Sequence, residues 1–350
     1  MINDNIIIFK YISSRPRRYN KVLNNKKKDC MVDYNVEGIT QRTMAQLANV
    51  SQSAVSRYLS TNNILPIEEG NHRNMRYNIA HVRQAIRALF DLDKKIIKKK
   101  HSFYNFKGGT GKTSICFQVA CHIALMGFNV LVIDADPQAH LSVSFGLAND
   151  ENLTLYDLIM GNQKPENVIH TIFNGLDCIP SNLSLTRLET EISQLPKREE
   201  RLKIDLESIE NNYDFIFVDT NPTISILNRN VVTYVDVLDI VCETQPYSLN
   251  GLKLLMEDLN RFWHHMRMAP KLINIIPNKY EDRTTNAAEA MTVLKMYYSE
   301  YIKENFAIRR SEDIVTSAKI GKPLALFAKK NSIAVEDITE LVHYIINISC

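Results

Sequence analysis

A glycine-rich segment after an apolar strand pattern constrains this chain more than any other feature. The segment is Lys107-Gly108-Gly109-Thr110-Gly111-Lys112-Thr113, and apolar residues at helical spacing follow it over 115–124. Glycines let the backbone turn several N–H groups toward one point, and the positive end of a helix dipole lies there too. A bare turn is the alternative, but the flanking strand and helix favour a loop that binds phosphate.

Two lysines and a missing glycine define the type of loop. Lys112 is placed to reach the β- and γ-phosphates of a nucleotide, and the Thr113 hydroxyl to bind Mg²⁺. The usual phosphate-loop pattern begins with a glycine, where this chain has Phe106. Lys107, directly before the glycines, is a lysine that the usual pattern lacks. The segment is therefore a deviant Walker A loop.

Short apolar strands alternate with amphipathic helical stretches from Ser102 onward. The expected strands are Ser102–Phe106, Val130–Asp134, Leu176–Ile179, Phe215–Asp219, Val237–Cys242 and Leu272–Pro277. Such alternation is typical of α/β proteins, in which a mostly parallel sheet carries helices on both faces. The fold that we expect is a P-loop NTPase.

Charge divides the chain into two parts. Residues 1–100 contain 19 Lys and Arg against 8 Asp and Glu (net +11), whereas the remainder contains 23 against 31 (net −8). A basic front part favours nucleic-acid binding, with a solvated basic arm as the alternative. We expect a basic arm over 1–30, a small α-helical or winged helix-turn-helix domain over 31–93, a basic linker over 94–101 and the α/β domain over 102–350.

Composition excludes several other classes of protein. With 45% hydrophobic and 23% charged residues, the chain has an ordinary globular composition. It contains no run of about 18 apolar residues, and its N-terminus lacks the charge order of a signal peptide. Six scattered cysteines without a CxxC pair indicate reduced thiols. We therefore expect a cytoplasmic protein that does not bind a membrane.

Motifs along the chain resemble those of the ParA/MinD family of ATPases. They are the loop 107–113, Val130-Leu-Val-Ile-Asp134-Ala-Asp136-Pro137-Gln138, Tyr213-Asp-Phe-Ile-Phe-Val-Asp219-Thr220, Cys178-Ile-Pro180-Ser181-Asn182 and Pro277-Asn278-Lys279-Tyr280. The Asp-Pro-Gln continuation resembles the ParA branch, and residues 341–350 lack the basic face of a membrane-binding helix. The resemblance covers about residues 102–348.

The resemblance implies ATP and Mg²⁺ as cofactors and a role for each residue of the site. The residues expected to bind nucleotide are Lys107, Gly108, Gly109, Thr110, Gly111, Lys112, Thr113, Ser114 and Asn278. Those expected to hold Mg²⁺ are Thr113, Asp134 and Asp219. Lys107, Lys112 and Asp136 are the expected catalytic residues, with Asp136 orienting the attacking water and Lys107 reaching the ATP of a second subunit. An ordinary loop residue is the alternative for Asn278.

The segment 40–59 predicts a helix-turn-helix. Met44, Leu47 and Ala48 share an apolar face, residues 49–51 form the turn, and Ser51 caps the second helix. The outward residues of that helix, where a recognition helix contacts base edges, are Gln52, Ser53, Ser56 and Arg57. A helical hairpin without a ligand is the alternative. The arrangement resembles the DNA-binding domain of the larger plasmid ParA proteins.

A second DNA surface is expected on the α/β domain. In the ParA/MinD family, arginines near the positions that correspond to 281–284 and 308–311 of this sequence bind DNA without sequence preference. Arg283 and Arg309 match them. Solvated surface charge is the alternative for each of the two.

Together these features predict a ParA-type partition ATPase that dimerises with ATP and binds operator DNA as well as non-specific DNA. The resemblance implies a ParB-like centromere-binding partner, association with the nucleoid and a plasmid as cargo. Two other functions stay open. One is a transcriptional repressor that nucleotide switches with negligible turnover, and the other is a positioning ATPase for a cargo other than DNA.

Overall fold

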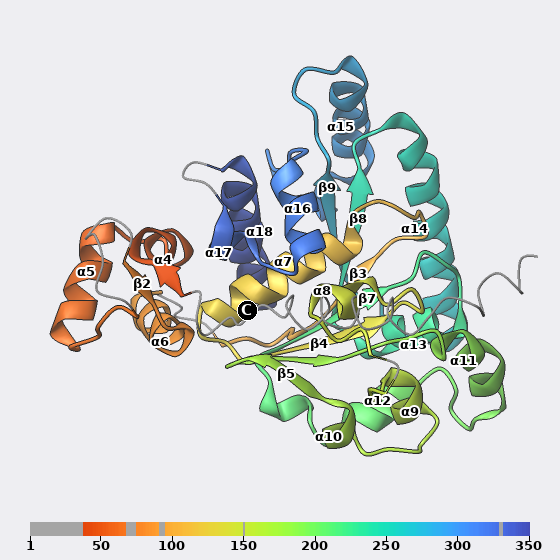
Figure 1. Ribbon diagram of the computed structural model, residues 1–350. Helices are drawn as coiled ribbons and strands as arrows, with labels where there is room; N and C mark the ends of the chain where they lie inside the picture. Colours follow the sequence, from red (N-terminus) through yellow and green to blue (C-terminus); the bar gives the residue numbers. More distant parts are fainter. Residues whose placement is uncertain (1–37, 68–74, 91–94, 150, 329–331) are drawn as a thin grey trace, which may run out of the picture. The chain divides into compact units, whose positions relative to one another are not determined.

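A computed structural model of the chain describes residues 38–67, 75–90, 95–149, 151–328 and 332–350 (Figure 1). The expected basic arm, 1–30, lies outside the described residues. From residue 38 onward the described residues belong to one compact unit. No helix among them is long and apolar enough to cross a membrane.

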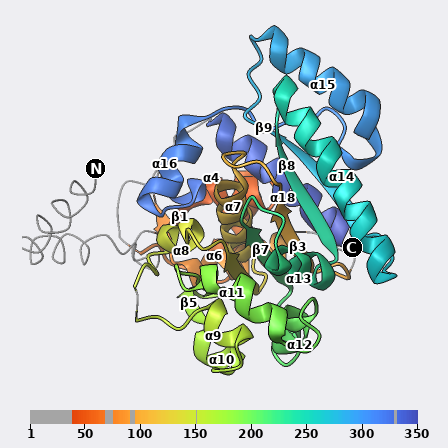
Figure 2. The same ribbon diagram turned by 90° about the vertical axis from the view of Figure 1, so that its right-hand side faces the viewer.

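A seven-stranded sheet forms the centre of the fold (Figures 1 and 2). In spatial order its strands are β5 (His170–Phe173), β6 (Leu176–Ile179), β4 (Val130–Ala135), β7 (Phe215–Thr220), β3 (Lys100–Tyr104), β8 (Val237–Glu243) and β9 (Leu272–Asn278). Neighbouring strands are parallel except β5, which is antiparallel to β6. The expected mostly parallel α/β sheet is confirmed.

Helices cover both faces of this sheet. One face carries α9 (Leu155–Ile159), α11 (Leu185–Glu191), α12 (Arg201–Leu206), α13 (Ile226–Tyr234), α14 (Pro246–Met266) and α15 (Thr285–Tyr298). The other carries α7 (Lys112–Leu125), with α16 (Glu312–Ile320) and α18 (Ile333–Ser349) packed beside it. The short helices α8 (His140–Ser144), α10 (Pro165–Val168) and α17 (Leu324–Phe327) lie between these elements in the chain.

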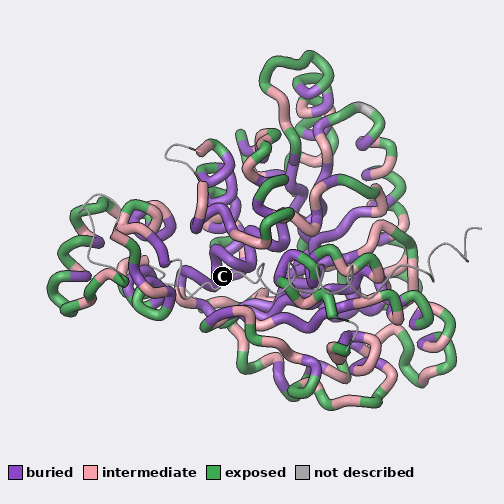
Figure 3. The backbone as a smooth tube through the Cα atoms, in the orientation of Figure 1, coloured by how far each residue is buried: buried purple, intermediate pink, exposed green. Residues whose placement is uncertain are grey.

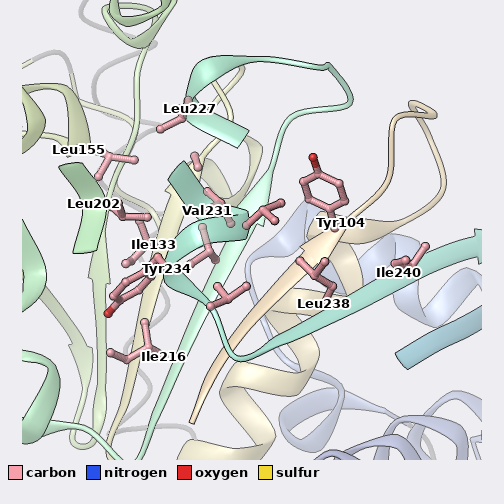
Figure 4. Packing of buried hydrophobic residues seen from close by; sticks show 14 of the residues in the cluster. Tyr104, Ile133, Leu155, Leu202, Ile216, Leu227, Val231, Tyr234, Leu238 and Ile240 are labelled. Atoms are coloured by element: carbon pink, nitrogen blue, oxygen red, sulfur yellow. The ribbon is translucent and has the colours of Figure 1, made fainter. Parts of the chain in front are cut away.

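Side chains alternate between the two faces along each strand, so each face of the sheet has its own apolar core. Ile216 and Val218 of β7 join a large apolar cluster beneath α9 and α11–α15 (Figure 4). Phe215 and Phe217 belong to the opposite set, and their rings stack with centroids 5.8 Å apart. Such a period of two is expected of a strand that is buried on both faces. Figure 3 shows the resulting concentration of buried residues in the sheet and in α7.

The first strand differs from its expected position. β3 begins at Lys100 and ends at Tyr104, whereas the sequence predicted Ser102–Phe106. Asn105 ends the strand because its side chain donates to the Val241 carbonyl (2.8 Å) and accepts from Lys107 N (2.9 Å). The expected linker 94–101 therefore overlaps the sheet by two residues. The edge strand β5 was not predicted, since its four residues carry little alternation.

A buried polar network ties α18 to the sheet. The His101 ring contacts Asp239 Oδ2 through Nδ1 (2.8 Å) and Ser349 Oγ through Nε2 (2.9 Å). Asn274 Nδ2 donates to the other oxygen of Asp239 (2.6 Å). His101, Asp239 and Ser349 have no exposed surface, so this serine–histidine–aspartate arrangement joins elements and admits no substrate.

Residues 38–90 form a smaller helical group. It contains α4 (Gln41–Leu47), α5 (Gln52–Thr61) and α6 (Ile79–Leu89), together with β1 (Ile39–Thr40) paired antiparallel to β2 (Arg76–Tyr77). The Ser51 side chain caps α5 by accepting from Ala54 N (3.2 Å), as predicted. Met44, Leu47 and Ala48 are buried, also as predicted.

Candidate functional site

The glycine-rich loop joins β3 to the N-terminus of α7. Gly109 and Gly111 have positive φ angles of 76° and 96°, and Gly111 begins the helix without any side-chain cap. A Cβ at Gly109 would have no neighbour within 4 Å, whereas a Cβ at Gly111 would collide with Asn278. The loop is therefore open toward Gly109, and the first N–H groups of α7 have no side-chain acceptor. This geometry suits a phosphate group.

The Lys112 ammonium lies inside the loop. Its side chain is only 6% exposed, and Nζ is 3.5 Å from the Lys107 carbonyl oxygen. Burial lowers the pKa of Lys112, while the charges of Asp219 and Asp136 act in the opposite direction. Thr113 and Ser114, the next residues of α7, are half-buried at the same end of the helix.

Asp219 at the end of β7 is the most unusual residue of the site. It is fully buried, and neither carboxylate oxygen accepts a regular hydrogen bond from the described residues. Burial raises its pKa well above the usual value, and the charge of Asp134 adds to this rise. The nearby Thr113 hydroxyl and Lys112 only partly oppose it. A buried unpaired carboxylate is costly, so the position suits a group that binds a cation.

Asp134 lies opposite Asp219 across β4 and β7. Its carboxylate accepts from Ser142 N (2.9 Å), Ser142 Oγ (2.7 Å) and Asp136 N (3.1 Å). Burial raises the pKa of Asp134 to about 6, and these hydrogen bonds limit the rise. Ser142 Oγ in turn accepts from Ser181 N (2.9 Å). Asp134 thus fixes the loop after β4, and its expected part in holding Mg²⁺ stays a prediction.

Asp136 directly follows β4. Its carboxylate accepts from Gln138 N (2.9 Å), and Ser181 Oγ donates to its carbonyl oxygen (2.5 Å). Asp136 is 8% exposed and lies at the edge of the loop. Its negative charge acts to raise the pKa of both Lys112 and Asp219. The sheet therefore brings Asp134, Asp136 and Asp219 to the same edge as the loop, as the sequence predicted.

The donor set fits a magnesium ion that arrives with a nucleotide. Within the described part of the chain, no three His, Cys, Asp or Glu side chains are grouped to hold a metal ion by themselves. Mg²⁺ keeps several waters and binds through one or two carboxylates together with phosphate oxygens. The unpaired Asp219 carboxylate and the Thr113 hydroxyl meet that requirement.

Lys107 is held by residues that the sequence did not point to. The Lys107 Nζ contacts Glu243 Oε2 (2.5 Å) and Ser248 Oγ (3.0 Å). A second lysine, Lys279, contacts the other oxygen of Glu243 (2.7 Å) and the Gly109 carbonyl (2.5 Å). Burial raises the pKa of Glu243, but the two lysines outweigh it and leave the pKa below its usual value. The one sign of this contact in the sequence was that a charged residue, Glu243, ends the apolar strand β8.

Asn278 is placed against the loop. Its amide donates to the Thr110 carbonyl (2.7 Å), and the side chain is buried. The adjacent Thr110 hydroxyl is buried without a hydrogen-bond partner in the described residues. The structure therefore gives Asn278 a supporting contact with the loop, and nucleotide binding by this residue stays a prediction.

Comparison with known proteins decides the family. The sequence profile of a family described as an AAA domain matches residues 97–272, half of the chain. The chromosome-partitioning ATPase Soj of Treponema pallidum is 30% identical over 226 residues, which are 64% of this chain and 88% of Soj. The chromosome partitioning protein ParA of Caulobacter vibrioides is 28% identical over 230 residues, 65% of this chain and 86% of ParA. This chain belongs to the ParA/Soj family of partition ATPases.

A solved structure shows the same fold. A putative plasmid partition protein of Borrelia burgdorferi, bound to AMPPNP, superposes with a TM-score of 0.60 and 22% identity over 72% of this chain and 99% of its own length. At this identity the likeness concerns the fold alone. The matched profile begins at residue 97, so the helical group at 38–90 of this ParA/Soj protein lies outside it.

The residues predicted to bind DNA have different surroundings. Gln52, Ser53, Ser56 and Arg57 are all exposed along α5. Arg283 is exposed after β9, and no ion pair involves it among the described residues. Arg309 is instead paired with Asp337 (Nε to Oδ1, 3.1 Å) and Glu336 (3.0 Å), whose contacts raise its pKa. Of the two arginines that the sequence predicted to contact DNA, Arg283 is therefore the more accessible in this ParA/Soj protein, and DNA binding by either stays a prediction.

We predict that Asp219→Asn stabilises the nucleotide-free protein by about 1–3 kcal/mol, because it removes a buried carboxylate whose burial Thr113 and Lys112 only partly offset. The sign follows from the raised pKa of Asp219. As the pH rises above the usual value of 3.8, the unfolded chain ionises first and folding stability falls until the folded-state pKa is reached. Urea unfolding between pH 4 and 8 measures this.

Asp136→Asn is the matched control. It keeps the contact with Gln138 N and should change stability by about 0.5 kcal/mol or less. A loss of stability in Asp219→Asn comparable to that of a core substitution would show that the carboxylate has a partner after all.

Proposed function

We propose that this chain is a DNA-partition ATPase that binds Mg·ATP at the loop 107–113 and hydrolyses it slowly. The observation that carries the proposal is the buried Asp219 carboxylate, which lacks a regular hydrogen bond and lies beside Lys112 and Thr113. A protein retains such a costly group where a bound cation offsets it. Membership of the ParA/Soj family supports the same conclusion.

Phosphoryl transfer requires positioning and charge neutralisation more than covalent chemistry. The N–H groups of the loop and of the start of α7 bind the phosphates, and the Lys112 ammonium neutralises charge on the β- and γ-phosphates. Mg²⁺, which Asp219 and Thr113 would hold, would supply further positive charge to the phosphates. The Asp136 carboxylate, at the edge of the loop, orients the attacking water and accepts its proton.

Dimerisation on ATP is the second part of the proposal. Lys107 is 37% exposed at its side chain, so it reaches solvent beside the open part of the loop. In a dimer it would leave Glu243 and contact the phosphates of the other subunit. The enclosed nucleotide would then stabilise the dimer, and hydrolysis would release it.

DNA binding is the third part. The exposed face of α5 supports recognition of an operator, and Arg283 supports sequence-independent binding by the ATPase body. A ParB-like partner that stimulates hydrolysis and a plasmid cargo on the nucleoid complete the proposal. A nucleotide-switched repressor is the second candidate, favoured by the exposed polar face of α5. It would bind ATP and the operator, but neither partner nor DNA would raise its turnover.

Lys112→Ala should lose both ATP binding and turnover, whereas Asp136→Ala should bind ATP normally and lose about 100-fold or more in rate. The reason is that Lys112 contacts the nucleotide and Asp136 acts on water. Binding of a fluorescent ATP analogue and phosphate release separate the two effects. Equal loss of ATP affinity in the two variants would sink this division of roles.

Lys107→Ala should bind ATP as a monomer and fail to dimerise, because the contact across the interface is lost. Light scattering with a slowly hydrolysed ATP analogue measures the mass. Glu243→Gln is the matched variant, since it releases Lys107 without removing it and should still dimerise. A normal nucleotide-dependent dimer of Lys107→Ala would show that Lys107 is an ordinary loop residue.

The two DNA surfaces should respond to separate substitutions. Arg57→Ala should cost about 1–3 kcal/mol of discrimination between a duplex selected by the full chain and a random duplex. Arg283→Ala should instead weaken ATP-dependent binding to both duplexes and reduce the salt slope by about 1. Each variant controls for the other in fluorescence anisotropy titrations. Unchanged discrimination in Arg57→Ala would remove α5 as the recognition element.

A further inference from the structure

A buried arginine of the helical group at 38–90 forms hydrogen bonds at the C-terminal end of α7, the helix that follows the loop. Arg83 of α6 is only 8% exposed. Its Nη1 donates to the Phe128 carbonyl (2.8 Å) and to the Ala124 carbonyl, and its Nη2 donates to Asn129 Oδ1 (3.1 Å). Ala124 lies in the last turn of α7, and the other two acceptors lie between α7 and β4. A single guanidinium therefore joins α6 to the C-terminal end of α7.

The surface around Arg83 is shaped to receive it. A Cβ at Gly175 would overlap the Arg83 guanidinium, and a Cβ at Gly127 would overlap the Arg83 carbonyl and the Arg87 side chain. Both glycines also have positive φ angles, 87° and 95°. Arg87, one turn further along α6, lies 4.3 Å above the Phe128 ring. The two surfaces, α6 and the turn after α7, are thus complementary in shape.

Burial makes this contact hard to break. The carbonyl groups at the end of a helix carry partial negative charge, which favours a cation there. Burial lowers the pKa of Arg83, and the charge of Asp214 partly offsets this effect. If α7 moved while α6 stayed in place, a buried charge would lose its hydrogen bonds, which costs more than the loss of a surface pair.

The other end of α7 lies at the proposed nucleotide site. The helix starts at Lys112, and 12 of its 14 residues are buried, so it is a stiff element about 21 Å long. Because the helix is stiff, a displacement of its N-terminus would be carried to Ala124 in its last turn. Further contacts attach the same helical group to the body, because His343 Nε2 of α18 bonds the Leu47 carbonyl (2.8 Å).

We propose that Arg83 is a positioning residue that couples nucleotide at the N-terminus of α7 to the helical group that presents α5. Movement of α7 on nucleotide binding shifts α6, and with it the exposed face of α5. Because coupling between two binding sites is reciprocal, DNA on α5 changes nucleotide affinity by the same factor. This inference rests on the proposed function for nucleotide and operator binding.

The test compares four full-length proteins: wild type, Arg83→Met, Arg83→Lys and Arg87→Met. Arg83→Met keeps an apolar side chain of suitable length without donors, and Arg87→Met is the matched control on the same helix. A slowly hydrolysed ATP analogue with Mg²⁺ is titrated with and without the selected duplex. Amide hydrogen exchange of residues 38–67 and 75–90 is followed with and without the same analogue.

In the wild type we expect the duplex to change nucleotide affinity by about fivefold or more and nucleotide to change exchange in α5 and α6. Both responses should vanish in Arg83→Met and persist in Arg87→Met, while nucleotide affinity without DNA stays unchanged. Arg83→Lys, whose single ammonium cannot reach all three acceptors, should lose most of the coupling and serves if Arg83→Met does not fold.

Two results would overturn the inference. One is a full exchange response to nucleotide in the folded Arg83 variants, and the other is a wild type in which nucleotide binds and leaves residues 38–90 unchanged. Failure of the proposed function looks different, because nucleotide or the duplex would then not bind to the wild type at all. Without duplex binding, the exchange response to nucleotide still decides the role of Arg83.

Discussion

The candidate site depends on one buried carboxylate at the end of a central strand. Asp219 is buried between the strands that carry Asp134 and the glycine-rich loop, and the described residues offer it no regular hydrogen bond. Parallel strands end at one edge of the sheet, so the loop, Asp134 and Asp136 meet there for topological reasons. The site is therefore assembled by the sheet, and its unsatisfied charge makes it receptive to Mg²⁺ with a nucleotide.

One helix connects this site with the rest of the molecule. α7 begins at the loop and is buried along nearly its whole length, so it is held by the sheet, α16 and α18. Its C-terminal end is held by Arg83 from the helical group at 38–90. In this ParA/Soj protein the side chain of Arg83 therefore joins the helix that follows the loop to the helical group that contains α5.

The sequence predicted what depends on local pattern. The loop, the strands that end at Asp134 and Asp219, and the Ser51 cap follow from glycine spacing, apolar runs and capping chemistry, and the structure places them as expected. The Glu243 contact with Lys107, the pairing of Arg309 with Asp337 and the burial of Arg83 could not be predicted. Each joins residues far apart in the chain, and a charged side chain in the sequence gives no sign of whether it will be solvated, paired or buried.

The most direct test of the account is calorimetric titration of the full chain with ATP, in Mg²⁺ and in EDTA, for the wild type and for Asp219→Asn. If the Asp219 carboxylate is there for the metal of Mg·ATP, Mg²⁺ will tighten ATP binding to the wild type. The same addition will have little effect on Asp219→Asn. ATP binding by the wild type that is equally tight with and without Mg²⁺ would contradict the account.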